Sequence, residues 1–92
     1  MTQTVSVTVQ IRNRLGMHAR AAAKLVDQAN RFSAHVELEK DGQTADAKSI
    51  MGVLLLCGGQ GSQLVIRATG EDAKAALEAL VALVENRFGE DE

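Results

Sequence analysis

The 92 residues and the formal net charge of −2 fit one small domain with a single core. Hydrophobic residues make up 46% of the chain and aromatic residues only 2%, so the core must be built from aliphatic side chains. No stretch approaches the roughly 20 apolar residues of a membrane span, and the N-terminus lacks the features of a signal peptide. We expect a cytoplasmic protein without membrane insertion, one domain over residues 1–92, ordered from about 4 to 88.

The single cysteine, Cys57, excludes an intrachain disulfide, and no group of side chains is spaced as structural zinc ligands. Neither histidine stands in a pattern that would activate the thiol, so we interpret Cys57 as a small apolar residue. The sequence therefore indicates no metal and no cofactor.

Charge is unevenly distributed along the chain. Residues 12–31 hold five basic residues and one acidic residue, a balance of +4, whereas residues 71–92 have a balance of −5. The basic segment could face an anionic ligand or an acidic partner, although scattered charge more commonly belongs to a solvated surface.

The first predicted element is a strand over residues 4–11, where every second residue is apolar and the residues between are polar. A sheet with one solvent-exposed face is typically antiparallel. A helix over residues 18–30 follows, with a buried stripe at helical spacing. The stripe consists of Ala22, Leu25, Val26 and Ala29.

Residues 34–40 alternate as a second strand, with His35 on its polar face and interpreted as solvated surface. Asp41-Gly42 predicts a tight hairpin to a third strand over residues 43–46. The apolar run 50–56 suits a strand or a short helix by periodicity alone. Because Ser49 is a good N-cap and glycines follow the run, we predict a short helix.

A last strand over residues 62–68 and a last helix over residues 71–87 complete the chain, with a frayed tail, GEDE. The apolar stripe of that helix consists of Ala73, Ala76, Leu77, Leu80, Val81, Val84 and finally Phe88. The order β-α-β-β-α-β-α predicts a two-layer open-faced α/β (α+β) sandwich, with a four-stranded antiparallel sheet and three helices on one face.

The start of the first helix lacks the Ser, Thr, Asp or Asn that normally caps the free N–H groups. An uncapped helix start binds anions, phosphate in particular, so the amides of Ala19 and Arg20 could cradle a phosphoryl group on His18. The Arg20 side chain could add a charge-assisted contact, and Gly16 lets the backbone bend. Neutral histidine is a suitable nucleophile. The simpler interpretation is that His18 is a surface residue without a specific function.

A second candidate site begins at Ser49. Its simpler interpretation is the N-cap of an apolar helix, but Ile50 and Met51 follow at once and cannot both face the core. This predicts an exposed docking patch. A phosphate on Ser49 would be favoured by the helix dipole and would place a charge of about −2 beside that patch.

The segment LGMHARAAAKL, residues 15–25, resembles the active-site segment of the HPr family, the histidine-containing phosphocarriers of the bacterial phosphoenolpyruvate-dependent phosphotransferase system. The family pattern is Gly-x-His-x-Arg-Pro-Ala, matched here by Gly16, His18, Arg20 and Ala22. The segment AKSIMGVL, residues 47–54, resembles the family's regulatory-serine region. Ala21 stands where the family has proline.

The resemblance implies that His18 takes a phosphoryl group, normally on Nδ1, from enzyme I and passes it to a IIA protein, with Arg20 stabilising the group. It implies that Ser49 is phosphorylated by HPr kinase/phosphorylase where that kinase exists, which weakens transfer. Docking residues would be Met17, Lys24, Ile50 and Met51. Such a protein is a stoichiometric carrier rather than an enzyme.

Two alternatives stay open at this point. One is a regulatory binding module of the same fold that is controlled mainly by phosphorylation of Ser49. The other is a small α/β domain that binds a ligand or nucleic acid, although the acidic net charge and the lack of Tyr and Trp argue against nucleic acid. The sequence does not select between a sugar branch and a nitrogen-type branch.

Overall fold

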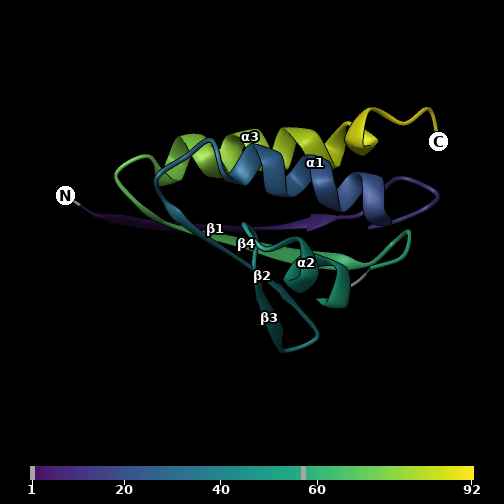
Figure 1. Cartoon of the computed structure of the whole chain (residues 1–92), viewed down its shortest axis with the longest axis horizontal. Coiled ribbons are helices and arrows are strands. Elements are labelled where there is room, and N and C mark those ends of the chain that lie inside the picture. The colour runs from purple at the N-terminus through teal and green to yellow at the C-terminus, as the bar shows by residue number, and fades with distance from the viewer. Residues whose placement is uncertain (1, 57) are drawn as a thin grey trace.

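The computed structural model describes residues 2–56 and 58–92, so Cys57 and its interpretation as a small apolar residue lie outside the described residues. One sheet carries helices on one of its faces (Figure 1). The elements in chain order are β1 (Gln3–Gln10), α1 (Ala19–Ala29), β2 (His35–Lys40), β3 (Gln43–Asp46), α2 (Ile50–Leu56), β4 (Gln63–Gly70), α3 (Ala73–Glu85) and a short 3₁₀ turn η1 (Arg87–Gly89). This order confirms the predicted fold class.

The sheet has the strand order β1-β4-β2-β3, and every neighbouring pair is antiparallel. Val9 lies opposite Leu64, and Leu38 lies opposite Ile66. All four side chains are buried against the helices, because alternate residues of a strand share a face. The polar residues of β1 lie on the solvated face, as their alternation predicts.

Two local sequence signals are confirmed by the backbone. Asp41 and Gly42 have φ values of +52° and +80°, the pair of left-handed residues that a two-residue hairpin prefers. The Ser49 Oγ accepts a hydrogen bond from the Gly52 N–H at 3.2 Å, so Ser49 caps α2 and the apolar run forms the predicted helix.

The end of the chain differs from its prediction. Helix α3 ends at Glu85, and Arg87, Phe88 and Gly89 follow with φ values of +55°, +54° and +80°. This left-handed turn buries Phe88 in the core, as its place in the apolar stripe predicts.

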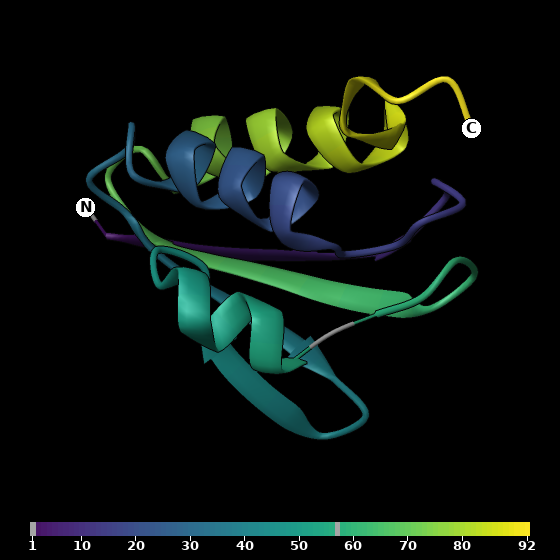
Figure 2. The same cartoon turned by 45° about the vertical axis from the view of Figure 1, so that its right-hand side comes forward.

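The tail was expected to fray, and this expectation is wrong. After the left-handed turn, the last residues lie at the end of the molecule where the loop before α1 and the start of α1 also lie (Figure 2). The Arg14 N–H donates to the Glu92 carbonyl at 2.8 Å, so the tail is bonded to the loop that precedes α1.

Over the part of the chain that the structure describes, no helix combines the length and the apolar character needed to cross a membrane.

Candidate functional site

The loop between β1 and α1 bends at Gly16, where φ is +66°. A Cβ at this position would lie 2.3 Å from the Gly58 carbonyl oxygen, which is far inside contact distance. The next residue, Met17, donates its N–H to that same oxygen at 2.7 Å. Glycine is therefore required both by the left-handed backbone and by the close approach of the two chain segments.

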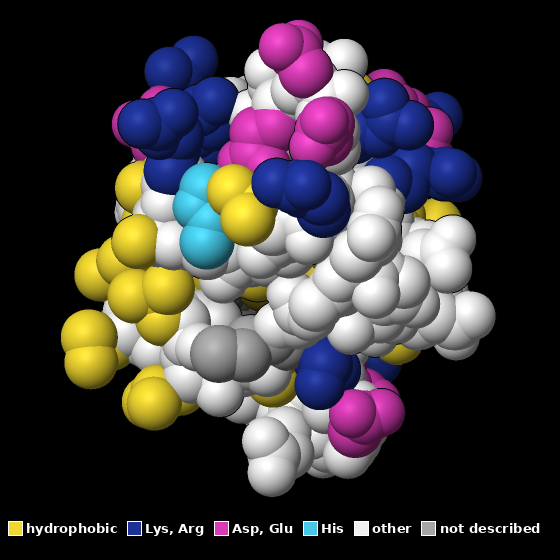
Figure 3. Space-filling model, turned by 90° about the vertical axis from the view of Figure 1, so that its right-hand side faces the viewer, with side chains coloured by type: hydrophobic (Ala, Val, Ile, Leu, Met, Phe, Trp, Pro, Cys, Tyr) yellow, Lys and Arg dark blue, Asp and Glu magenta, His cyan; other side chains and the backbone are white. Residues whose placement is uncertain are grey.

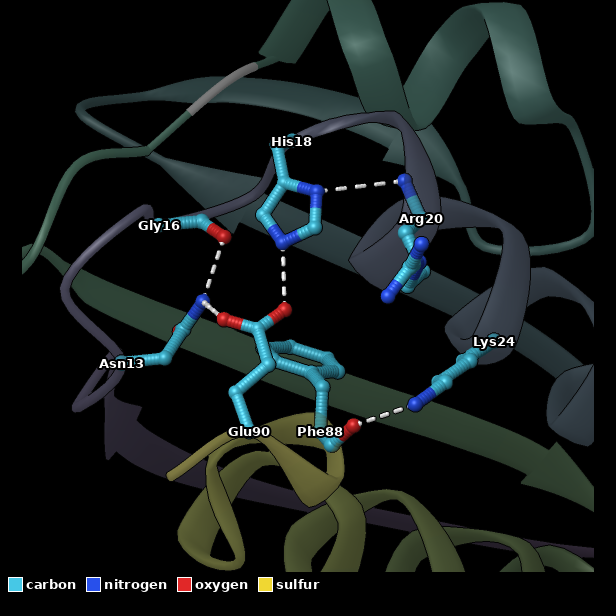
Figure 4. Close-up of polar contacts among 7 residues, drawn as sticks. All are labelled: Asn13, Gly16, His18, Arg20, Lys24, Phe88 and Glu90. Carbon is cyan, nitrogen blue, oxygen red and sulfur yellow. Dashed lines mark hydrogen bonds and ion pairs between the residues drawn. The ribbon is translucent and has the colours of Figure 1, made fainter. Parts of the chain in front are cut away.

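His18 is itself the N-cap of α1. Its backbone is extended, and its Nδ1 accepts a hydrogen bond from the Arg20 N–H at 3.2 Å (Figure 4). The expectation of a helix start without a cap is therefore wrong, because the imidazole supplies the acceptor. Since only an unprotonated ring nitrogen accepts a hydrogen bond, the lone pair of Nδ1 points at the start of the helix.

The other ring nitrogen of His18, Nε2, bonds to Oε2 of Glu90 (Figure 4). The second oxygen of Glu90 accepts from Nδ2 of Asn13 at 3.0 Å. The hydrogen bond from Asn13, and next the contact with His18, lower the pKa of Glu90 below its usual range. Its carboxylate is therefore ionised at neutral pH.

Asn13 connects the loop to the tail from a completely buried position. Its Nδ2 also donates to the Gly16 carbonyl at 2.7 Å, while its Oδ1 has no hydrogen-bond partner among the described residues. Sequence reasoning missed both Asn13 and Glu90, and neither belongs to a spacing pattern that would have identified it.

Arg20 is exposed beside His18, and its guanidinium makes no hydrogen bond or ion pair to any described residue. Together with Arg14 and Leu15, it lines an open hollow next to the imidazole. This side chain is thus available to an incoming anion. Ala21, at the position of the family's proline, is the third residue of α1 and is completely buried.

Two of the four predicted docking residues have contacts within the domain. Met17 is only 7% exposed and packs in the core, so it contributes almost nothing to the surface. Lys24 donates from Nζ to the Phe88 carbonyl at 2.7 Å and so supports the left-handed turn.

The other two predicted docking residues, Ile50 and Met51, are 39% and 62% exposed, which confirms the prediction of exposed apolar surface at the start of α2. Leu15 and Leu55 are also exposed. Figure 3 shows hydrophobic side chains on the same face as a histidine and several basic and acidic groups. His35 is exposed on β2, as expected.

Comparisons with known proteins find relatives over most of the chain. The family model described as PTS HPr component phosphorylation site matches residues 5–86. The phosphocarrier protein HPr of Cupriavidus necator is 49% identical over 80 residues, covering 87% of this chain and 90% of that protein. The phosphocarrier protein NPr of Proteus mirabilis is 48% identical over 84 residues, covering 90% and 93%.

Among solved structures, the crystal structure of HPr from Thermoanaerobacter tengcongensis superposes with a TM-score of 0.93. It is 43% identical and covers 96% of this chain and 99% of that one. The fold, the histidine at the helix start and these matches together show that the chain belongs to the HPr family of phosphocarrier proteins of the bacterial phosphotransferase system.

Proposed function

We propose that this chain is a stoichiometric carrier that accepts a phosphoryl group from enzyme I on Nδ1 of His18 and passes it to a IIA protein. The observation that carries the proposal is the direction of the Nδ1 lone pair, which points at the N-terminus of α1. The helix start offers N–H donors and partial positive charge to a phosphoryl group bound at that nitrogen.

In the transfer step, the Nδ1 lone pair attacks phosphorus, and the bond between phosphorus and the donor atom breaks with its electron pair leaving on the donor. The Arg20 N–H, freed from Nδ1, can then donate to a phosphoryl oxygen, with the Ala19 N–H beside it. The Arg20 guanidinium, which is unpaired within residues 2–56 and 58–92, supports the same role, because it can reach phosphoryl oxygens without first breaking an ion pair there. The reverse sequence releases the group to the acceptor.

The open hollow beside His18 supports a carrier rather than an enzyme that encloses its substrate. Two proteins must reach the same nitrogen in turn, and the imidazole is 27% exposed. The exposed side chains of Ile50 and Met51 would give those partners an apolar contact surface.

Ser49 is the proposed regulatory phosphorylation site, for HPr kinase/phosphorylase where that kinase exists. It lies directly before the exposed apolar residues of α2 and is half-buried. A phosphate there would add about −2 charge next to the contact surface. Relatives named HPr and NPr match this chain at nearly equal identity, 49% and 48%.

The test is phosphorylation by enzyme I and labelled phosphoenolpyruvate. We expect the wild type to be labelled and His18→Ala to remain unlabelled. His35→Ala is the matched control, because it removes the other histidine, which is exposed on β2, and should be labelled like the wild type. Full labelling of His18→Ala would overturn the proposal.

A further inference from the structure

The last residues of the chain, 87–92, form a segment that we call the C-terminal latch. Its first part is the left-handed turn of Arg87, Phe88 and Gly89. Residues with a Cβ adopt this conformation at a cost in free energy, so two of them in succession need support from their surroundings. Burial of Phe88 and the hydrogen bond from Lys24 to its carbonyl supply that support.

The left-handed turn brings Glu90 to the imidazole. The residues after the turn lie at the end of the molecule where the loop before α1 also lies (Figure 2), and Figure 4 shows Glu90 facing His18. The carboxylate then meets Nε2 of His18 on one oxygen and the buried amide of Asn13 on the other. Because Asn13 is itself bonded to the Gly16 carbonyl, the carboxylate is held in orientation as well as in place.

The two hydrogen bonds of the ring define one neutral tautomer. Nδ1 accepts from the Arg20 N–H, so the ring proton lies on Nε2 and is donated to the Glu90 carboxylate. A carboxylate that accepts a hydrogen bond from the second nitrogen of an imidazole fixes the tautomer and stabilises positive charge that develops on the ring.

We propose that Glu90 is a positioning residue for phosphoryl transfer, which keeps the proton on Nε2 and leaves the Nδ1 lone pair available. This inference rests on the proposed function.

When Nδ1 forms its bond to phosphorus, the bond to the donor atom breaks and the donor takes the electron pair. The ring becomes positively charged, its proton stays on Nε2, and the adjacent carboxylate stabilises that charge. The side chains are 27% and 18% exposed, so solvent screens this interaction only in part.

The experiment compares Glu90→Ala and Glu90→Gln with the wild type. The first measurement is the rate of His18 phosphorylation by enzyme I. The second is the pair of ring ¹⁵N chemical shifts of His18 in the unphosphorylated protein, which reports the tautomer. Glu85→Gln is the matched control, because it removes one negative charge at an exposed position near the end of α3.

We expect Glu90→Ala to slow phosphorylation about tenfold, or roughly 1.4 kcal/mol, and to raise the fraction of rings protonated on Nδ1. Glu90→Gln retains an oxygen that can accept from Nε2, so it should keep the wild-type tautomer and show an intermediate rate. This rescue separates positioning of the ring from a purely structural role of the latch. Glu85→Gln should match the wild type in both measurements.

Wild-type rates and shifts in Glu90→Ala would overturn the inference. If Glu90→Ala does not fold, Glu90→Gln decides: a rate equal to that of Glu85→Gln would also overturn it. Failure of the wild type to be phosphorylated would instead contradict the proposed function, and the ¹⁵N shifts would still decide whether Glu90 sets the tautomer.

Discussion

The imidazole of His18 uses its two nitrogens differently: Nδ1 caps α1 and Nε2 meets a carboxylate. A side chain that caps a helix is held by the helix backbone, so its orientation does not depend on a flexible surface rotamer. This explains how a half-buried histidine can be aimed with its lone pair at the helix start. The Nδ1 lone pair therefore points at the start of α1 both in the capping role and in the proposed chemical role.

Arg20 lies in the first turn of α1 with an exposed guanidinium that has no partner among the described residues, so its removal tests charge stabilisation with little structural cost. We expect Arg20→Ala to slow phosphoryl transfer from enzyme I by roughly tenfold or more, because a charge-assisted hydrogen bond to the phosphoryl oxygens is lost. Rapid-quench kinetics would measure the rate, and urea unfolding would verify that stability is unchanged.

Arg31→Ala is the matched control for Arg20→Ala. Arg31 lies just beyond the other end of α1 in an exposed ion pair with Asp27, which should contribute little to stability. Transfer should proceed at the wild-type rate in this variant. An Arg20→Ala rate equal to that of Arg31→Ala would remove the proposed role of Arg20.

At the scale of single residues, the sequence identifies the residues at the start of α1. It misses Asn13 and Glu90, which hold those residues in place. Gly16, His18 and Arg20 lie within five positions, where spacing is informative. Glu90 is 72 residues away from His18, and Asn13 is a polar residue that composition alone would place on the surface. Their roles depend on tertiary contacts that no local pattern encodes.

At the scale of elements, Asp72 connects the start of α3 to the chain before β2. It occupies the N-cap position, but its side chain makes no cap bond, and its carboxylate instead accepts from the N–H groups of Ser33 and Ala34 at 2.8 Å each. The hydrogen bond from Ser33, with that from Ala34, lowers the pKa of Asp72 below its ordinary value of 3.8. The ionised carboxylate is therefore the form that stabilises the fold.

This pKa shift predicts a pH-dependent stability. The contribution of Asp72 is fully present above pH 3.8, the ordinary pKa of its carboxyl, and is lost as the pH falls through the lower pKa of the folded state. We expect Asp72→Asn to unfold at lower urea concentration than the wild type at pH 7, and we expect this difference to shrink in acid below pH 3.8.

Glu71→Gln serves as the control for Asp72→Asn, because Glu71 is the adjacent acidic residue and is exposed. It should unfold at the wild-type urea concentration at pH 7. If the deficit of Asp72→Asn were equally large at neutral and acidic pH, the ionised carboxylate would not be the source of the stabilisation.

Elements with local stop and start signals are predictable, and those set by tertiary contacts are not. Asp41-Gly42 and Ser49 define the hairpin and the start of α2 from their own backbone preferences. The end of α3 is different, because Arg87 and Phe88 have no intrinsic preference for a left-handed turn. Burial of Phe88 offsets the cost of the left-handed backbone, and the turn at Phe88 then sets the path of the tail.

At the scale of the whole molecule, the site is assembled from the loop before α1, the segment at Gly58 and the C-terminal latch. These parts meet at one end of the sandwich, and Figure 3 shows exposed hydrophobic side chains on the same face as a histidine. The fold thus provides both the proposed phosphoryl-accepting nitrogen and exposed apolar side chains that partner proteins could contact.

A charge at Ser49 tests that proposed docking surface. Asp is a good N-cap, so Ser49→Asp should keep α2 folded while placing a negative charge beside the exposed apolar residues. We expect its affinity for enzyme I to fall by about tenfold, or roughly 1.4 kcal/mol, in isothermal titration calorimetry.

Thr44→Asp provides the charge-matched control for Ser49→Asp, because Thr44 is exposed on β3. Its affinity for enzyme I should equal that of the wild type. Equal affinities of the two variants would count against regulation through charge at Ser49.

The central claim is that Nδ1 of His18 carries the phosphoryl group. The most direct measurement is ³¹P and ¹⁵N NMR of the ¹⁵N-labelled protein after phosphorylation by enzyme I and phosphoenolpyruvate. We predict coupling of phosphorus to Nδ1 of His18, with Nε2 remaining protonated and facing Glu90. A phosphoryl group on Nε2, on His35 or on any other side chain would contradict the account.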